Sequence, residues 1–163
     1  MKYLYAIITA LALGSASAAE LKIGVVDAER LTRESAPAQR ASKQLEQEFA
    51  PRLQAIETRA QRITELQQRL EKDGATLSAG DRRSAEQELQ RLSLDAERQR
   101  REYDEDFNTR RRQELAALFE RAHRIIQRIA EAEGYDLVLQ DAVYRTPGAD
   151  MTQRVLDALA KEK

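Results

Sequence analysis

Apolar residues in the central part of the sequence, between positions 38 and 133, recur at alternating intervals of three and four. This spacing is the a/d repeat of a coiled coil, and it constrains the fold more than any other feature. The repeat runs through Phe49, Leu53, Ile56, Ala60, Ile63, Gln67 and Leu70, and again through Leu89, Leu92, Ala96, Gln99 and Tyr103. Glu, Gln, Arg, Ala and Leu dominate both stretches, and these residues lose little side-chain freedom in a helix. The pattern therefore predicts long helices.

A short break near residues 72–80 separates the two helical stretches. It contains Gly74, which suits the left-handed position at a helix C-terminus, and it ends in Ser78-Ala79-Gly80-Asp81, which fits a capping box. A break of this length lets the second helix fold antiparallel onto the first. We therefore expect residues 38–133 to form a helical-hairpin (coiled-coil) arm with its tip near 72–80. Ser35 is placed to cap the first helix, and Gly134 should stop the second. We also expect a kink at Pro51, inside the outbound helix.

The two ends of the chain replace the helical pattern with short β-branched runs. Residues 21–27 read as a strand, and so do residues 135–140 and 142–146, before a last amphipathic helix. We expect residues 20–37 and 134–163 to form a small β-rich body. The predicted fold class is therefore α+β, mostly α, with the arm projecting from this body.

A body this small buries little apolar area and leaves strand edges unpaired, so the sequence predicts that more than one copy must associate. Joining equivalent sheets into a closed barrel solves both problems, and this argument leaves the number of copies open. The residues that we expect in the oligomerisation body are Ile23, Val25, Leu137, Leu139 and Val143.

The first nineteen residues have the layout of a cleaved signal peptide. Lys2 precedes the apolar run Leu4 to Leu13, and Ala16-Ser17-Ala18 then offers small residues for cleavage after Ala18 or Ala19. The apolar run is shorter than the ~20 residues that a membrane-spanning helix needs. We therefore expect residues 1–19 to direct export and to be removed.

The composition argues against several function classes. The chain has 27 basic and 28 acidic residues, so it lacks the basic excess of a nucleic-acid-binding protein. It has no cysteine, and its single histidine, His123, gives little support to a zinc site. Phosphate-binding glycine motifs are absent, and the carboxylates lie along helices rather than paired in a cleft. We predict no catalytic residue, no cofactor and no metal.

Three segments, in their order around a charged hairpin, resemble the Skp (OmpH-like) family of periplasmic chaperones. They are Lys22-Ile23-Gly24-Val25-Val26-Asp27, Gln44-Leu45-Glu46-Gln47-Glu48-Phe49 and Gly134-Tyr135-Asp136-Leu137-Val138-Leu139. The resemblance implies a periplasmic homotrimer with a β-barrel body and three helical arms around a cavity. It also implies ATP-independent holding of unfolded outer-membrane proteins. The best-known members are strongly basic, whereas this chain is nearly neutral, so client capture cannot depend on a large positive net charge.

We expect apolar residues on the inner face of the arm to contact unfolded clients, and the candidates are Leu53, Leu66, Leu94, Tyr103 and Phe107. An alternative reading makes these residues part of the seam between the two helices, which applies above all to Leu53 and Tyr103. Leu66 and Leu94 fall off the heptad positions and are therefore the better candidates for a client surface.

Other readings of the arm remain open from the sequence. The arginine clusters at residues 82–83, 98–101 and 110–112 could contact lipopolysaccharide phosphates or a membrane surface. Interleaved Glu and Asp residues favour a solvated, ion-paired face instead. A structural or adaptor coiled coil of the cell envelope, without chaperone activity, is the alternative function. A lipid carrier would need a wider apolar face with aromatic anchors.

Overall fold

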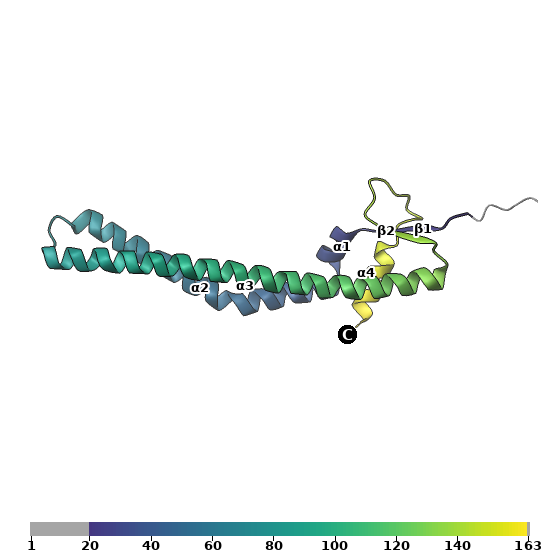
Figure 1. Cartoon of the computed structure of the whole chain (residues 1–163), viewed down its shortest axis with the longest axis horizontal. Coiled ribbons are helices and arrows are strands. Elements are labelled where there is room, and N and C mark those ends of the chain that lie inside the picture. The colour runs from purple at the N-terminus through teal and green to yellow at the C-terminus, as the bar shows by residue number, and fades with distance from the viewer. Residues whose placement is uncertain (1–19, 163) are drawn as a thin grey trace, which may run out of the picture.

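The computed structural model of the protein describes residues 20–162, so the predicted signal peptide at residues 1–19 lies outside the described residues. A long arm of two helices projects from a small body (Figure 1). The elements in chain order are β1 (Ile23–Val26), α1 (Ala28–Glu34), α2 (Ala36–Asp73), α3 (Ala79–Glu133), β2 (Leu137–Gln140) and α4 (Thr152–Lys161). The predicted fold class, mostly helical with a small sheet, is confirmed.

The helices α2 and α3 run antiparallel and side by side, as the repeat predicts (Figure 1). Each begins at a serine that caps it, because the hydroxyl oxygen accepts a hydrogen bond from a backbone amide in the first turn. Ser35 Oγ lies 3.3 Å from Ala38 N, and Ser78 Oγ lies 3.1 Å from Asp81 N. Pro51 lies inside α2, which continues on both sides of it.

The two glycines expected to end helices behave differently. The helix α3 ends before Gly134, as predicted, and this glycine has the left-handed conformation, with φ 69°. Gly74 follows α2 with φ −57°, so its predicted left-handed conformation is wrong. The tip instead stays right-handed, since Gly74 N donates to Leu70 O and Thr76 N donates to Asp73 O.

The two ends of the chain meet in a parallel sheet at the base of the arm. Within residues 20–162 this sheet has the strands β1 and β2, in a register that pairs Ile23 with Leu137 and Val25 with Leu139. Residues 149–151 run along the other edge of β1, where Val25 N donates to Ala149 O at 2.8 Å and Met151 N donates to Val25 O at 3.0 Å. β1 is therefore covered on both edges, whereas β2 lies at the edge of the sheet.

Residues 142–146 do not form the strand that their composition predicts. The chain turns out of β2 at Asp141, which has φ 56° and accepts a hydrogen bond from Ala28 N through its side chain at 2.9 Å. The following loop then leaves the sheet, where no strand of the described chain lies alongside it (Figure 1). A strand needs a partner for its backbone groups, and this segment has none within the described residues.

The hydrophobic core joins the arm to the body. It consists of Val26, Leu31, Leu118, Ala122, Ile125, Met151, Val155, Leu156 and Leu159. Three of these residues lie on α3, in a stretch that the sequence assigns to the arm. The last turns of α3 therefore pack beneath β1, α1 and α4, so the arm extends directly out of the core instead of being hinged to it by a loop.

The close approach of β1 to α4 should depend on Gly24. A Cβ atom at this position would lie 2.6 Å from the sulfur of buried Met151 and 3.1 Å from the ring of Tyr135. We expect Gly24→Ala to destabilise the protein by about 1–3 kcal/mol through overpacking, measured by urea unfolding. Gly148→Ala is the matched control, since a Cβ there meets nothing within 4 Å. Equal stabilities of the two variants would contradict this account.

Candidate functional site

Three aromatic rings meet in the seam of the arm. Phe49 of α2 is 4% exposed and packs edge-to-face on Tyr103 and Phe107 of α3, with ring centroids 5.7 and 5.3 Å apart. Tyr103 and Phe107 stack on each other with an interplanar angle of 6°. The structure therefore places Tyr103 and Phe107 in the seam, with part of each ring still open to solvent.

The other three candidate client residues separate by burial. Leu66 is 4% exposed, so the prediction that it lies outside the seam is wrong. The seam uses Leu66 where the repeat points to Gln67, because the apolar side chain is the better one to bury and the polar amide stays in solvent. Leu53 is half-buried, and Leu94 is 61% exposed. Of the five candidates, Leu94 presents the most open apolar surface.

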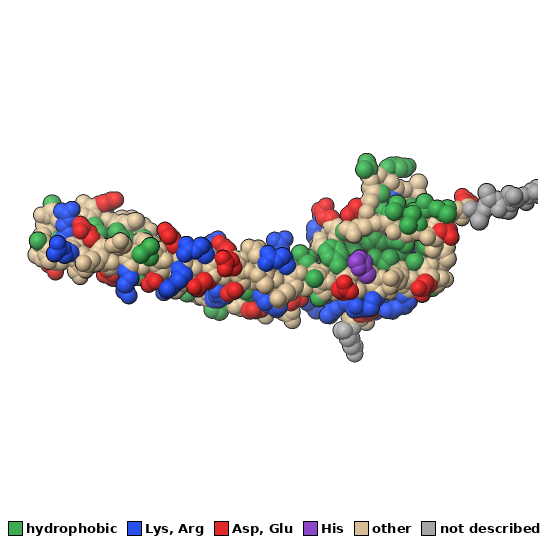
Figure 2. Space-filling model, in the orientation of Figure 1, with side chains coloured by type: hydrophobic (Ala, Val, Ile, Leu, Met, Phe, Trp, Pro, Cys, Tyr) green, Lys and Arg blue, Asp and Glu red, His purple; other side chains and the backbone are tan. Residues whose placement is uncertain are grey.

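Ion pairs across the seam hold α2 and α3 in register. Arg52 lies 2.7 Å from Asp106, with its guanidinium 5.6 Å from the Phe49 ring centroid. Arg62 and Glu88 form a looser pair at 3.7 Å. Such exposed pairs contribute at most about 1 kcal/mol each. Figure 2 shows acidic and basic side chains interspersed along the arm, which accords with a solvated, ion-paired face.

The outer face of the sheet is apolar and open. Ile23, Leu137 and Leu139 are each about two-fifths exposed, at 39%, 44% and 42%. Strand residues alternate between faces, so Val26 and Val138 point the other way, toward the core. Val25 is 4% exposed, so this candidate assembly residue is buried and not on the surface. Figure 2 shows apolar side chains gathered on the body.

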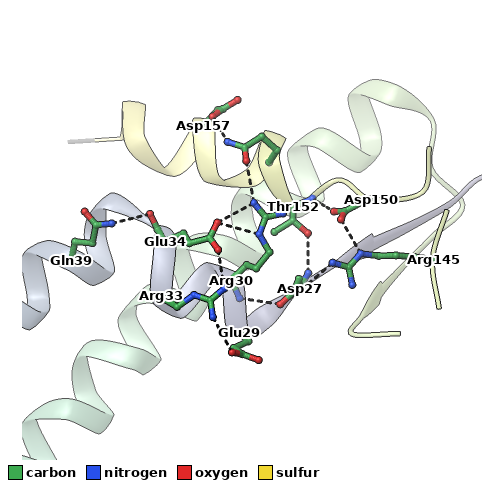
Figure 3. Close-up of polar contacts among 11 residues, drawn as sticks. Asp27, Glu29, Arg30, Arg33, Glu34, Gln39, Arg145, Asp150, Thr152 and Asp157 are labelled. Carbon is green, nitrogen blue, oxygen red and sulfur yellow. Dashed lines mark hydrogen bonds and ion pairs between the residues drawn. The ribbon is translucent and has the colours of Figure 1, made fainter. Parts of the chain in front are cut away.

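The loop after β2 presents a second apolar surface, and ion pairs hold the loop to the body. Val143 is fully exposed and Tyr144 is 82% exposed. The next residue, Arg145, lies between two carboxylates, 3.0 Å from Asp27 and 2.8 Å from Asp150 (Figure 3). Sequence reasoning missed this network, since Asp27 and Arg145 are 118 positions apart and no local motif links them.

This network holds both aspartates in their charged form. Partial burial raises the pKa of Asp150, but hydrogen bonds from Thr152 and Arg145 outweigh it and lower that pKa to about 2. The backbone amide of Arg30 is the main cause of the lowered pKa of Asp27, to which Arg145 also contributes. Asp27 N in turn donates to the Thr152 hydroxyl at 3.0 Å. The contacts join β1, the loop and α4.

Residues 20–162 contain no cluster of three or more His, Cys, Asp or Glu side chains that could hold a metal ion. Over the same part of the chain, no helix combines the length and the apolar character needed to cross a membrane.

The comparisons with known proteins agree with this architecture. The family profile described as "Outer membrane protein (OmpH-like)" matches residues 22–159. The protein named chaperone protein Skp in Yersinia enterocolitica is 29% identical over 158 residues, covering 95% of this chain and 96% of the relative. The Skp-like protein of Pseudomonas aeruginosa is 27% identical and covers 95% of this chain and 94% of its own length.

A solved structure shares the fold. The crystal structure of an OmpH-like protein from Caulobacter crescentus, 14% identical in sequence, superposes with a TM-score of 0.71 over 87% of this chain and 85% of that one. A helical-hairpin arm that projects from a small body with an open apolar sheet face is the architecture that places this chain among the helical-arm proteins. The chain belongs to the OmpH-like family, as the three sequence segments predict, and the relatives described above carry the names chaperone protein Skp and Skp-like protein.

The aromatic contact should dominate the stability of the arm. We expect Phe49→Ala to destabilise the protein by about 3–5 kcal/mol, because it removes a buried ring between two others. Hydrogen exchange should then quicken in α2 and α3 around the missing ring. The matched control is Leu94→Ala, which removes an exposed side chain and should change stability by less than about 0.5 kcal/mol. Similar losses in the two variants would refute the assignment of Phe49 to the seam.

The carboxylate network should make stability fall in acid. Because Asp150 has a lowered pKa in the folded protein, its contribution is complete above the usual value of 3.8 and is lost as the pH falls through about 2. We expect this contribution to be on the order of 1 kcal/mol after solvent screening. Urea unfolding at pH 5 and pH 2.5 should show a smaller acid loss in Asp150→Asn than in the unchanged protein.

The exposed carboxylate of Asp73, at the far end of α2, supplies the control for this pH experiment. Asp73→Asn removes the same charge without touching the network, so its acid loss should equal that of the unchanged protein. If Asp150→Asn and Asp73→Asn respond alike, the network does not link folding to protonation.

Proposed function

We propose that the protein is an ATP-independent holdase that binds unfolded outer-membrane β-barrel proteins in the periplasm and prevents their aggregation. Membership of the OmpH-like family and the name chaperone protein Skp on a relative support the chaperone class. The observation that carries the proposal is a long projecting hairpin arm on a body with an open apolar sheet face. Export through the signal peptide expected at residues 1–19 is part of the proposal.

The chemistry of the clients explains why such an arm is useful. A barrel strand carries apolar side chains at every second position, and these are exposed while the chain crosses an aqueous space. Such segments aggregate readily. Arms set around a cavity isolate one chain through many weak contacts, and each contact must be weak because no nucleotide drives release. The contacts proposed for the arm are Leu94 and the open edges of Leu53, Tyr103 and Phe107. Leu66 is buried and makes no contact while the seam is closed.

Assembly into a homotrimer is the second part of the proposal. The open face formed by Ile23, Leu137 and Leu139 is apolar, and β2 lies at the edge of the sheet with Val143 just beyond it. Covering this face with equivalent surfaces of other copies removes apolar area from water and pairs the strand edge. The number three comes from the family resemblance.

A light-scattering experiment tests the chaperone activity. A denatured outer-membrane β-barrel protein is diluted from urea with and without the purified protein, in the absence of nucleotide. We expect suppression of scattering at about one trimer per client, as strands of a single client fill one cavity. A spacer protein of the envelope would leave the scattering unchanged, and that result would falsify the holdase proposal.

The same assay tests the role of assembly. We expect Leu137→Glu with Leu139→Glu to give monomers in sedimentation experiments, because two charges on the joined faces cannot be desolvated. Helical content should stay the same, and suppression should be lost. Leu94→Glu is the matched control, since it places a charge on an exposed apolar site of the arm, away from the sheet, and should leave assembly intact. Oligomers formed by the double variant would contradict the assembly surface.

A further inference from the structure

A groove of about 690 Å³ opens where the arm joins the body, apart from the exposed sheet, and Phe107 of the aromatic seam is one of its lining residues. Its walls are α1, the first turns of α2 and the stretch of α3 between residues 107 and 121, which meet at the body end of the arm (Figure 1). Apolar residues that line the groove include Ala41, Leu45, Leu115 and Leu118. The volume is in the range of ~300–1,000 Å³ that is usual for ligand pockets.

Unneutralised arginines surround this apolar lining. Arg40, Arg111 and Arg121 line the groove with exposed side chains, and none of them takes part in an ion pair within residues 20–162. Of the two glutamates in the lining, Glu114 pairs with an arginine outside the groove, which leaves Glu46 as the unpaired acid among the described lining residues. The groove therefore carries a local positive excess on a chain whose formal net charge is −1.

We propose that this groove binds an extended client segment that carries both apolar and carboxylate side chains. The proposal rests on the holdase function and names one place on the protein at which a client would be held. It also answers the difficulty raised by the near-neutral net charge: a local group of three arginines attracts acidic segments even though the whole chain does not.

The geometry matches this occupant in two ways. In an extended segment, side chains alternate between two sides, so the apolar ones can lie on the lining while the carboxylates turn toward the rim. Guanidinium groups bind carboxylates with paired, charge-assisted hydrogen bonds, and their aliphatic stems cover apolar surface at the same time. A purely apolar segment would bring no carboxylates to the arginines. A purely acidic segment would leave the apolar lining in contact with water.

Fluorescence anisotropy with labelled peptides tests the proposal. The probe is an unstructured peptide of about ten residues, one barrel strand in length, in which Leu and Val alternate with Glu. A second peptide has Gln in place of Glu. We expect Arg40→Gln, Arg111→Gln and Arg121→Gln together to weaken binding of the acidic peptide by about tenfold, and to leave the Gln peptide unaffected.

Matched variants separate the groove from general charge effects. Arg83→Gln, Arg91→Gln and Arg101→Gln remove the same charge from exposed sites on the arm and should change affinity by less than about twofold.

A second pair of variants tests the groove by its shape. Ala117→Trp should block the groove, because Ala117 is exposed and lines it, whereas Ala116→Trp, just outside the lining, should not. Equal affinities across the two arginine sets, or across the two tryptophan variants, would overturn the proposal.

The scattering assay distinguishes failure of the holdase proposal from failure of the groove proposal. If the unchanged protein does not suppress aggregation, the holdase function itself is wrong. If it suppresses aggregation and the acidic peptide binds all variants equally, only the groove assignment is wrong.

Vesicles of phosphatidylglycerol provide the last comparison. Loss of vesicle binding in the groove variants, with peptide binding intact, would identify an anionic lipid as the occupant and reject the client segment.

Discussion

The parallel pairing of β1 with β2 is the contact on which the rest of the structure depends. It joins positions more than a hundred residues apart, and it is extended by the hydrogen bond from Lys22 N to the carboxylate of Asp136 at 2.7 Å, across 114 positions. A stiff hairpin arm brings the two ends close, which lowers the entropic cost of closing so long a loop. Once the strands pair, the bases of α2 and α3 are held at the core and the arm has a defined direction.

The same pairing leaves apolar side chains of the sheet exposed to solvent. Its inner face packs on the core, but its outer face shows Ile23, Leu137 and Leu139 to solvent, and the loop beyond β2 adds Val143. The arm has the opposite character, because its exposed surface is charged and its seam is held by one aromatic cluster and a few solvated ion pairs. An apolar face on the body and a charged arm with scattered apolar residues suit the proposed holding function, which needs association at the body and weak contacts along the arm.

Local signals predicted most of the fold and a smaller part of the candidate site. The serine caps at Ser35 and Ser78 and the stop at Gly134 depend on neighbouring residues alone, so the helix boundaries followed from the sequence. The strand expected at residues 142–146 failed because strand formation requires a partner at its edge. Leu66 was misplaced because a strict repeat cannot tell which of two adjacent side chains, Leu or Gln, turns into the seam.

The sequence by itself determined that this chain is a long helical hairpin between two short strands, because helix preference, capping and apolar spacing act over a few residues. Only the tertiary structure decided which apolar residues remain on the surface, how Arg145 comes to lie between Asp27 and Asp150, and where three arginines gather around one groove. These features depend on which distant segments meet. That is a property of the packed chain, and no local stretch of sequence contains it.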